Sequence, residues 1–296
     1  MEKERDLPPE ITNFKFPKNM EHEEQKNLYD AKLVAWRAEN KEIKDLKNEI
    51  AAIYFKKEFP DLKHTFVKEM KAVVCIDEGC AHKDYNGEGK LALAGSGILL
   101  PAQSEDERVQ ITAKLFSEMG IKDITSHEGC GAVGLAYKRD FPDKKPTAQE
   151  IEQYGQEWTK KVALEMGRMG HEANTDHIAA EEMERPAEFH NARAVYFDGI
   201  GGFNPNKEIG LPMGFVISRR FLPAEYAGQE LQVAASIAFG HHGFGDLFTA
   251  AEPLIIIPLA ETEEQLADLK TEIEKALQDN KNYQDKKIKI DGVVVK

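Results

Sequence analysis

Three residues in the first half of the chain have the side chains and the spacing of a metal site. Cys75 follows the short apolar run Ala-Val-Val, and His127 and Cys130 stand three residues apart in the turn Ser-His-Glu-Gly-Cys-Gly. A spacing of three at the start of a helix can turn both side chains to one side. Two thiolates and one imidazole suit tetrahedral zinc, and three protein ligands leave one position for water or substrate. The sequence therefore predicts a zinc (Zn2+) site.

Asp77, two residues beyond Cys75, can complete this site in two ways. It can orient a water molecule as a hydrogen-bond acceptor, or it can bind the ion as a fourth ligand and close the site. Two thiolates formally cancel the charge of the ion, so bound water should be less acidic here than over three histidines. In the open form, the ion would produce a hydroxide nucleophile near neutral pH.

Cys80 has three candidate roles: a buried small side chain, a fourth zinc ligand in place of Asp77, or a redox-sensitive thiol. With four filled positions the site would be structural. The chain has three cysteines, too few for a disulfide framework. A bond between Cys75 and Cys80 is conceivable, but a reducing compartment disfavours it.

Strands and helices that alternate along the chain would bring these residues together. The pattern predicts strands at 72–76, 91–94 and 121–125, and a helix over 104–119 that Ser104 caps and Gly120 ends. In open α/β sheets, ligands bind at the carboxyl ends of the strands, where Cys75 and His127 stand. We expect a three-layer α/β domain with a mainly parallel sheet flanked by helices.

The rest of the chain predicts an N-terminal helical arm and an extended C-terminal half. Residues 1–20 have no core pattern, and 23–59 reads as helix with a heptad-like apolar stripe that packs on its own domain or on a second subunit. The expected division is 1–65 for the arm and long helix and 66–296 for the α/β domain. No internal repeat is visible. Later elements are expected as follows: helix 148–169, strands 194–197, 214–217 and 254–257, helix 266–277, and an edge strand or hairpin at 288–295.

The order of these motifs resembles that of the β-class carbonic anhydrases. VVCIDEG is similar to their Cys-x-Asp-x-Arg segment, and FSEMGIKDITSHEGCGAVGLA resembles their helix, glycine turn, strand and His-x-x-Cys-Gly segment. Between them, LALAGSGIL is similar to the family's strand that ends in Asn-Ala-Gly-Asn. The resemblance covers about residues 65–137. It departs at Gly79, which stands where the family has an Arg.

The resemblance implies zinc on Cys75, His127 and Cys130 and a carbonate dehydratase (lyase) that hydrates carbon dioxide reversibly to bicarbonate. Hydrolysis of carbonyl sulfide or carbon disulfide would need the same hydroxide. It also implies a homodimer in which N-terminal helices embrace the partner subunit. Asp77 would orient or gate the water, and the family's Arg, absent at Gly79, would hold this Asp off the metal.

The expected substrate pocket includes a glycine-rich turn and the position where the family has its arginine. Gly79 and the turn Gly95, Ser96 and Gly97 would line the substrate pocket. Because Gly79 cannot supply a guanidinium group, a second function stays open. It is a non-catalytic zinc-binding protein of the same fold, in which Asp77 or Cys80 closes a structural or sensing site.

Composition excludes several classes of partner. Acidic residues number 52 against 39 basic ones, a formal charge of -13, which argues against nucleic-acid binding and anionic membrane surfaces. No apolar run approaches the roughly 18 residues of a membrane span, and the start of the chain lacks a signal-peptide pattern. We expect a cytoplasmic location.

Other histidines have weaker signals. His241 and His242 lie in a glycine-rich stretch and predict an exposed loop or, alternatively, a substrate contact or proton shuttle. His171, His177 and His190 lie in or next to an acidic stretch over 172–188, which predicts a solvated connector rather than a second metal cluster. The loop after 194–197 lacks the spacing of a phosphate-binding loop.

Overall fold

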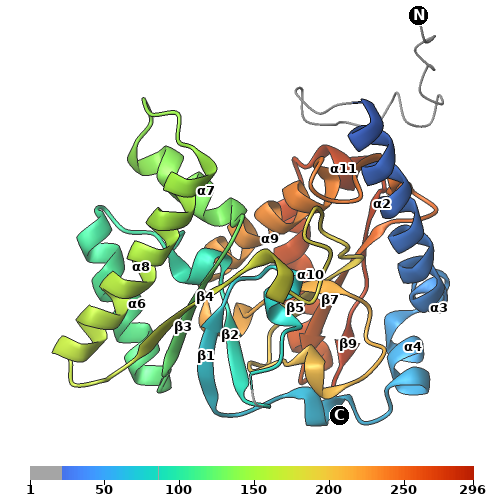
Figure 1. Ribbon diagram of the computed structural model, residues 1–296. Helices are drawn as coiled ribbons and strands as arrows, with labels where there is room; N and C mark the ends of the chain where they lie inside the picture. The colour runs from blue at the N-terminus through green and yellow to red at the C-terminus, as the bar shows by residue number, and fades with distance from the viewer. Residues whose placement is uncertain (1–21, 86) are drawn as a thin grey trace, which may run out of the picture.

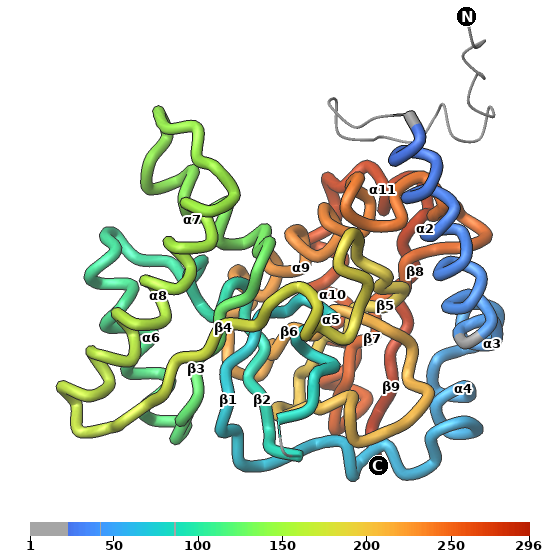
Figure 2. Tube along the Cα trace, in the orientation of Figure 1, coloured from blue at the N-terminus to red at the C-terminus, as the bar shows by residue number. Residues whose placement is uncertain are grey.

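Parallel strands and flanking helices alternate along residues 22–85 and 87–296, which the computed structural model describes (Figures 1 and 2). The expected arm over 1–20 lies outside this part of the chain. The α/β class is confirmed, and the strands form two sheets rather than one. None of the helices described is long and apolar enough to cross a membrane.

The first sheet has the strand order β2-β1-β3-β4, and every pairing in it is parallel. Its strands are β1 (Met70–Val74), β2 (Gly89–Ala92), β3 (Asp123–His127) and β4 (Asn174–Ile178). Its helices are α5 (Glu78–Ala81), α6 (Glu105–Met119), α7 (Gly131–Asp140) and α8 (Ala148–Arg168). As expected, the Ser104 side chain caps α6, and Gly120 ends it in the left-handed region at φ 74°.

The second sheet has the order β6-β5-β7-β8, with β9 also beside β7, and it too is entirely parallel. The C-terminal tail is therefore not a hairpin, because β8 and β9 each pair with β7. Its strands are β5 (Ala194–Asp198), β6 (Gly214–Ile217), β7 (Leu254–Ala260), β8 (Ile288–Ile290) and β9 (Val293–Val294). Its helices are α9 (Ala224–Phe239), α10 (Glu263–Leu277) and α11 (Lys281–Gln284).

The two halves of the chain repeat one topology that the sequence does not reveal. In each half, the first strand is central, the second and third strands flank it, and the fourth lies beyond the third. A helix joins the second and third strands in both, α6 in one and α9 in the other. Figure 1 shows these two units side by side. We call residues 70–178 the first unit and 194–294 the second unit.

The three metal ligands that the sequence predicts all belong to the first unit. All three cysteines precede residue 131. In the second unit, β5 ends in Asp198, whose carboxylate accepts the backbone N–H groups of Ile200, Gly201 and Phe203 at 2.7 to 3.0 Å. The second unit therefore ends its first strand in a self-capped loop, where the first unit has Cys75.

The second unit meets the first at the edge where the metal ligands lie. The end of β6 lies against the ends of β1 and β2, since the N–H of Val216 donates to the Ile76 carbonyl at 3.1 Å and that of Ser218 to the Ala92 carbonyl at 3.2 Å. Short 3-10 turns complete the connections among the residues described: η1 (Leu62–Thr65), η2 (Ala94–Gly97), η3 (Ala180–Glu182), η4 (Pro205–Lys207), η5 (Arg219–Phe221) and η6 (Gly245–Leu247).

The helical segment expected over 23–59 forms three helices that pack on the same chain. They are α2 (His22–Glu42), α3 (Lys44–Asn48) and α4 (Ala51–Glu58). Trp36 lies edge-on to Phe244 and Phe248, with ring centroids 4.9 and 5.1 Å apart. In Figure 2 these helices run along the outer side of the second unit. Of the expected stripe, Ile50 and Ile53 are exposed.

The edge strand β4 is absent from the sequence prediction. Its residues Asn174, Thr175 and Asp176 are exposed and polar, so they give no apolar alternation. Parallel pairing with β3 holds them in the sheet. A polar strand of this kind suits an edge, because exposed charge discourages pairing with another chain.

Docking of α2 should contribute measurably to stability. Trp36 is buried between two phenylalanine rings, and the Arg193 guanidinium carbon lies 3.6 Å from the centre of its ring. We expect Trp36→Ala to lower the free energy of unfolding by about 3 to 5 kcal/mol, measured by chemical denaturation. The matched change Val34→Ala on the same helix, at a side chain 68% exposed, should cost about 0.5 kcal/mol or less. Equal effects would contradict this packing.

Candidate metal centre

The three expected ligands converge at the carboxyl ends of β1 and β3. The sulfur atoms of Cys75 and Cys130 lie 3.9 Å apart, and one ring nitrogen of His127 lies within 4.8 Å of both. All three side chains are buried. Two thiolates on one tetrahedral zinc ion at the usual bond length stand about 3.8 Å apart. The cluster therefore has the composition and spacing to bind a metal ion.

The imidazole of His127 is oriented for a ligand. Its Nδ1 lies 2.9 Å from the carbonyl oxygen of Glu128. A carbonyl only accepts, so the bond places a hydrogen on Nδ1 and leaves the lone pair of Nε2 free in the neutral ring. In the part of the chain that the structure describes, the buried Nε2 has no hydrogen-bond partner. A buried ring nitrogen without a partner is costly whether or not it carries a proton, and a metal ion bound to the neutral ring would satisfy it.

Cys75 is held by a turn with an unusual backbone. Its sulfur accepts the backbone N–H of Gly95 at 3.2 Å. Gly95 and Ser96 both have left-handed backbone conformations, with φ of 54° and 53°. The Ser96 hydroxyl donates to the Thr125 carbonyl at 2.5 Å, and the Trp158 indole donates to the Ser96 carbonyl at 3.1 Å. These bonds fix a conformation that a serine rarely adopts.

The expected pocket turn is thus a buried support for the sulfur. Gly95, Ser96 and Gly97 are all buried, and a side chain at Gly95 would place its Cβ 2.8 Å from Ile98. The turn lies beside the three-residue cluster, and its place in a substrate pocket stays a prediction. What the structure adds is its role as a donor to Cys75.

Cys130 lies at the N-cap of α7, next to the positive end of the helix. The hydrogen bond with Cys75 lowers the pKa of Cys130 and raises that of Cys75 well above its usual value, and burial raises the latter further. Backbone N–H groups at the start of α7 also favour the Cys130 thiolate. Burial opposes protonation of His127, but its interaction with the Cys75 sulfur raises its pKa to about 9. Without an ion, protons are therefore held tightly within this cluster.

A guanidinium group does hold Asp77, and it comes from Arg185. The Nε of Arg185 donates to Oδ1 of Asp77 at 2.9 Å, and Nη2 donates to Oδ2 at 3.0 Å. A Cβ on Gly79 would lie 2.6 Å from Cγ of Arg185, so a larger residue there would collide with it. The expectation that Asp77 lacks a guanidinium partner is wrong, because the arginine occupies the same space from a distant segment.

Glu78 and His190 extend this network behind Asp77. Glu78 is fully buried and accepts the N–H of Asn191 at 2.9 Å, and its other oxygen lies 2.9 Å from Nδ1 of His190. Burial opposes ionisation of Asp77, but His190 and Arg185 beside it hold its pKa well below the usual value. Asp77, Glu78 and His190 lie close enough together to share an ion. Glu78 and His190 are bonded to each other and Asp77 is bonded to Arg185, so we assign these side chains a positioning role.

The end of the acidic stretch over 172–188 is therefore not a solvated connector. The side chains of Arg185 and His190 are only 5% and 11% exposed. His177 lies elsewhere, with Nδ1 2.9 Å from the Ser126 hydroxyl and Nε2 3.0 Å from a Glu152 oxygen. His171 is exposed. The three histidines that the sequence places in and around this stretch do not meet.

Cys80, His241 and His242 lie outside the candidate metal cluster. Cys80 is buried and outside the ligand cluster, so it is a small packed side chain in this structure. His241 and His242 are exposed in a loop, with ring centroids 3.8 Å apart and the rings tilted at 44° to each other. Neither belongs to a metal-sized cluster of the residues described.

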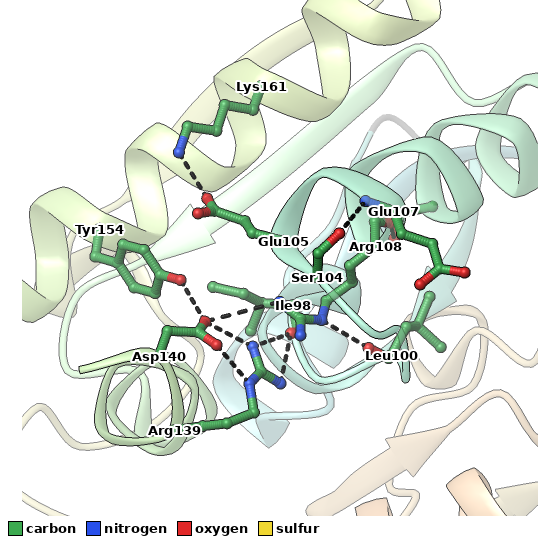
Figure 3. Close-up of polar contacts among 11 residues, drawn as sticks. Ile98, Leu100, Ser104, Glu105, Glu107, Arg108, Arg139, Asp140, Tyr154 and Lys161 are labelled. Carbon is green, nitrogen blue, oxygen red and sulfur yellow. Dashed lines mark hydrogen bonds and ion pairs between the residues drawn. The ribbon is translucent and has the colours of Figure 1, made fainter. Parts of the chain in front are cut away.

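A second polar cluster fixes α7 relative to the turn η2 (Figure 3). The carboxylate of Asp140, at the end of α7, accepts two bonds from Arg139 at 2.8 Å and one from the Tyr154 hydroxyl at 2.6 Å. The same guanidinium reaches the carbonyl of Ile98, directly after η2, at 3.4 Å. Cys130 precedes α7, and η2 supports Cys75. This cluster therefore helps fix the positions of the two sulfur atoms relative to each other.

Comparison with family models, with curated proteins and with solved structures found no match to this chain.

The ligand cluster predicts a sharp difference among the three cysteines. We expect the purified protein to bind about one zinc or cobalt ion per chain, measured by elemental analysis after dialysis. Cys75→Ala and Cys130→Ala should lose this ion, because each removes a thiolate ligand. Cys80→Ala, which also removes a buried thiol, should keep it. Loss of the ion in Cys80→Ala would place the third cysteine on the metal instead.

Proton competition predicts the direction of the pH dependence. With its pKa at about 9, His127 is protonated below that pH in the metal-free protein and must lose this proton to bind an ion. Affinity should therefore fall as pH falls below 9, by about tenfold per pH unit for each proton displaced. Chelator competition at pH 6.5, 7.5 and 8.5 measures this. A flat profile would contradict the shared-proton account of the cluster.

Proposed function

We propose that this protein is a zinc-dependent lyase similar to the β-class carbonic anhydrases, which hydrates carbon dioxide reversibly to bicarbonate. The observation that carries the proposal is the pairing of Arg185 with Asp77 beside a cluster of two cysteines and one histidine. The resemblance implies a guanidinium–carboxylate pair at this place. Gly79 cannot supply the guanidinium group, and Arg185 supplies it from a different segment. The thiolate ligands favour work in a reducing compartment, for which the cytoplasm is the natural candidate.

Each residue would have a defined task in this reaction. Cys75, His127 and Cys130 would hold the ion, and zinc would lower the pKa of water at its fourth position. Arg185 keeps Asp77 ionised and bonded away from the three ligand atoms. Oδ2 of Asp77 accepts one short bond, from Arg185, so it retains a lone pair for a water or substrate hydroxyl.

The activity would not need a second subunit to complete the site. Ligands, Asp77, Arg185 and the contacts to the second unit all lie within one chain. The homodimer that the resemblance implies stays a separate prediction, which sedimentation of the purified protein tests.

A closed, non-catalytic zinc site is the second candidate. The burial of Cys75, His127 and Cys130, each 5% exposed or less, favours it, since buried ligands restrict access to the ion. X-ray absorption of the zinc-loaded protein separates the two candidates. The open site is supported by two sulfur ligands, the histidine nitrogen and a fourth, lighter ligand that exchanges with added anions. Three sulfur ligands, or a carboxylate that does not exchange, support the closed site.

Removal of Arg185 tests the catalytic proposal directly. We expect stopped-flow hydration of carbon dioxide to fall by about 10- to 100-fold in Arg185→Ala at equal zinc content, because Asp77 loses its orientation and can reach the ion. Arg185→Lys should recover little, since an ammonium group cannot bind bidentately.

The control is Arg168→Ala, at an exposed arginine remote from the site, which should match the parent protein. A zinc-loaded parent with no hydration activity would refute the carbonic anhydrase assignment. Carbonyl sulfide hydrolysis would then be assayed on the same samples, because it needs the same site.

A further inference from the structure

A buried carboxyl group of the second unit reaches the support of Cys75. Glu230 lies on α9 and is 5% exposed. Its Oε1 accepts the backbone N–H of Ala94 at 2.8 Å, and the next N–H along the chain, that of Gly95, donates to the Cys75 sulfur at 3.2 Å. Glu230 and Cys75 therefore bind consecutive amides of one turn.

The same helix also lies beside Cys130. Ile237, seven residues and about two turns after Glu230, points the same way. Its Cδ1 would lie 3.9 Å from a Cβ added at Gly131, the residue that follows Cys130. Ala234, between them on this face, is fully buried. Figure 1 shows α9 at the boundary between the two units. One face of α9 thus bonds to the turn that supports Cys75 and lies beside the residue that follows Cys130.

Simple packing does not account for a glutamate at this position. Its second oxygen, Oε2, is buried and has no hydrogen-bond partner within 22–85 and 87–296. Burial raises the pKa of Glu230 to about 8. A buried carboxyl group with a single bond costs more than an apolar side chain of the same size. A group retained at this cost beside a metal cluster is a candidate for a functional role.

We propose that Glu230 is a positioning residue of the metal centre, contributed by the second unit, which fixes the turn at Ala94–Gly97 so that the Gly95 N–H points at the Cys75 sulfur. The second unit then has a function of its own: it holds no metal, and it sets the metal affinity of the first. The inference rests on the metal cluster and not on the reaction proposed for it.

The physical effect passes through the backbone. The left-handed pair Gly95 and Ser96 is a strained turn that needs support on every side. Thr125 and Trp158 support it from the first unit, and Glu230 supports it from the second. An N–H group aimed at a ligand sulfur draws charge from the thiolate, and so tunes the bond between the sulfur and the ion.

The test compares Glu230→Met with Glu230→Gln. Methionine has a similar length but cannot accept the Ala94 N–H, whereas glutamine can. With cobalt(II) as the probe, we expect Glu230→Met to bind about 10- to 100-fold more weakly in chelator competition and to shift the near-ultraviolet thiolate-to-cobalt band. Glu230→Gln should restore both properties. Glu225→Met, at an exposed glutamate on the same helix, is the matched control and should leave both unchanged.

A second readout needs no metal. In the metal-free protein, the Gly95 amide proton should move upfield in the proton–nitrogen NMR spectrum of Glu230→Met and stay in place in Glu230→Gln, because it reports the N–H···S bond itself. Glu230→Leu gives a second acceptor-free variant, and circular dichroism confirms folding. A folded Glu230→Met or Glu230→Leu with unchanged Gly95 resonance would overturn the proposal, whether or not carbon dioxide is hydrated.

Discussion

The bidentate ion pair between Arg185 and Asp77 connects the metal-ligand loop of the first unit to the segment that leads into the second. Both side chains are about 5% exposed, so the pair is removed from water. A buried pair of this kind adds little net stability over apolar packing, but loss of one partner leaves an uncompensated charge. The pair fixes the direction of the Asp77 carboxylate, two residues beyond Cys75.

The same segment explains why Gly79 is a glycine. The backbone of α5 passes so close to Arg185 and Met183 that a Cβ there would lie 2.6 and 2.8 Å from them. An arginine in the ligand loop and an arginine from the connector would compete for one space. A chain that supplies the guanidinium group from the connector therefore needs a small residue in the loop. The residue at position 79 is limited by the side chain at position 185.

The repeated topology gives the C-terminal half a physical purpose. The second unit has no thiol, and Asp198 fills its own loop with a carboxylate. Yet β6 lies against the ends of β1 and β2, α9 bonds to the turn that supports Cys75 and lies beside Gly131, and α2 packs along the outer side of the second unit. One unit thus carries the candidate metal ligands, and the other packs against the edge of the sheet where they lie.

The sequence by itself predicted most of the elements, because they depend on local patterns, and it named the three residues that form the candidate cluster. Strand and helix periodicity, the Ser104 cap, the Gly120 stop and the His-x-x-Cys spacing all lie within a few residues, and the structure agrees with each. The polar edge strand β4 was missed because it has no apolar face. Arg185 lies 108 residues from Asp77, and Glu230 lies 136 residues from Ala94. Only the tertiary structure could decide these contacts, and with them the shared topology of the two units, because chain folding sets which distant side chains share a buried space.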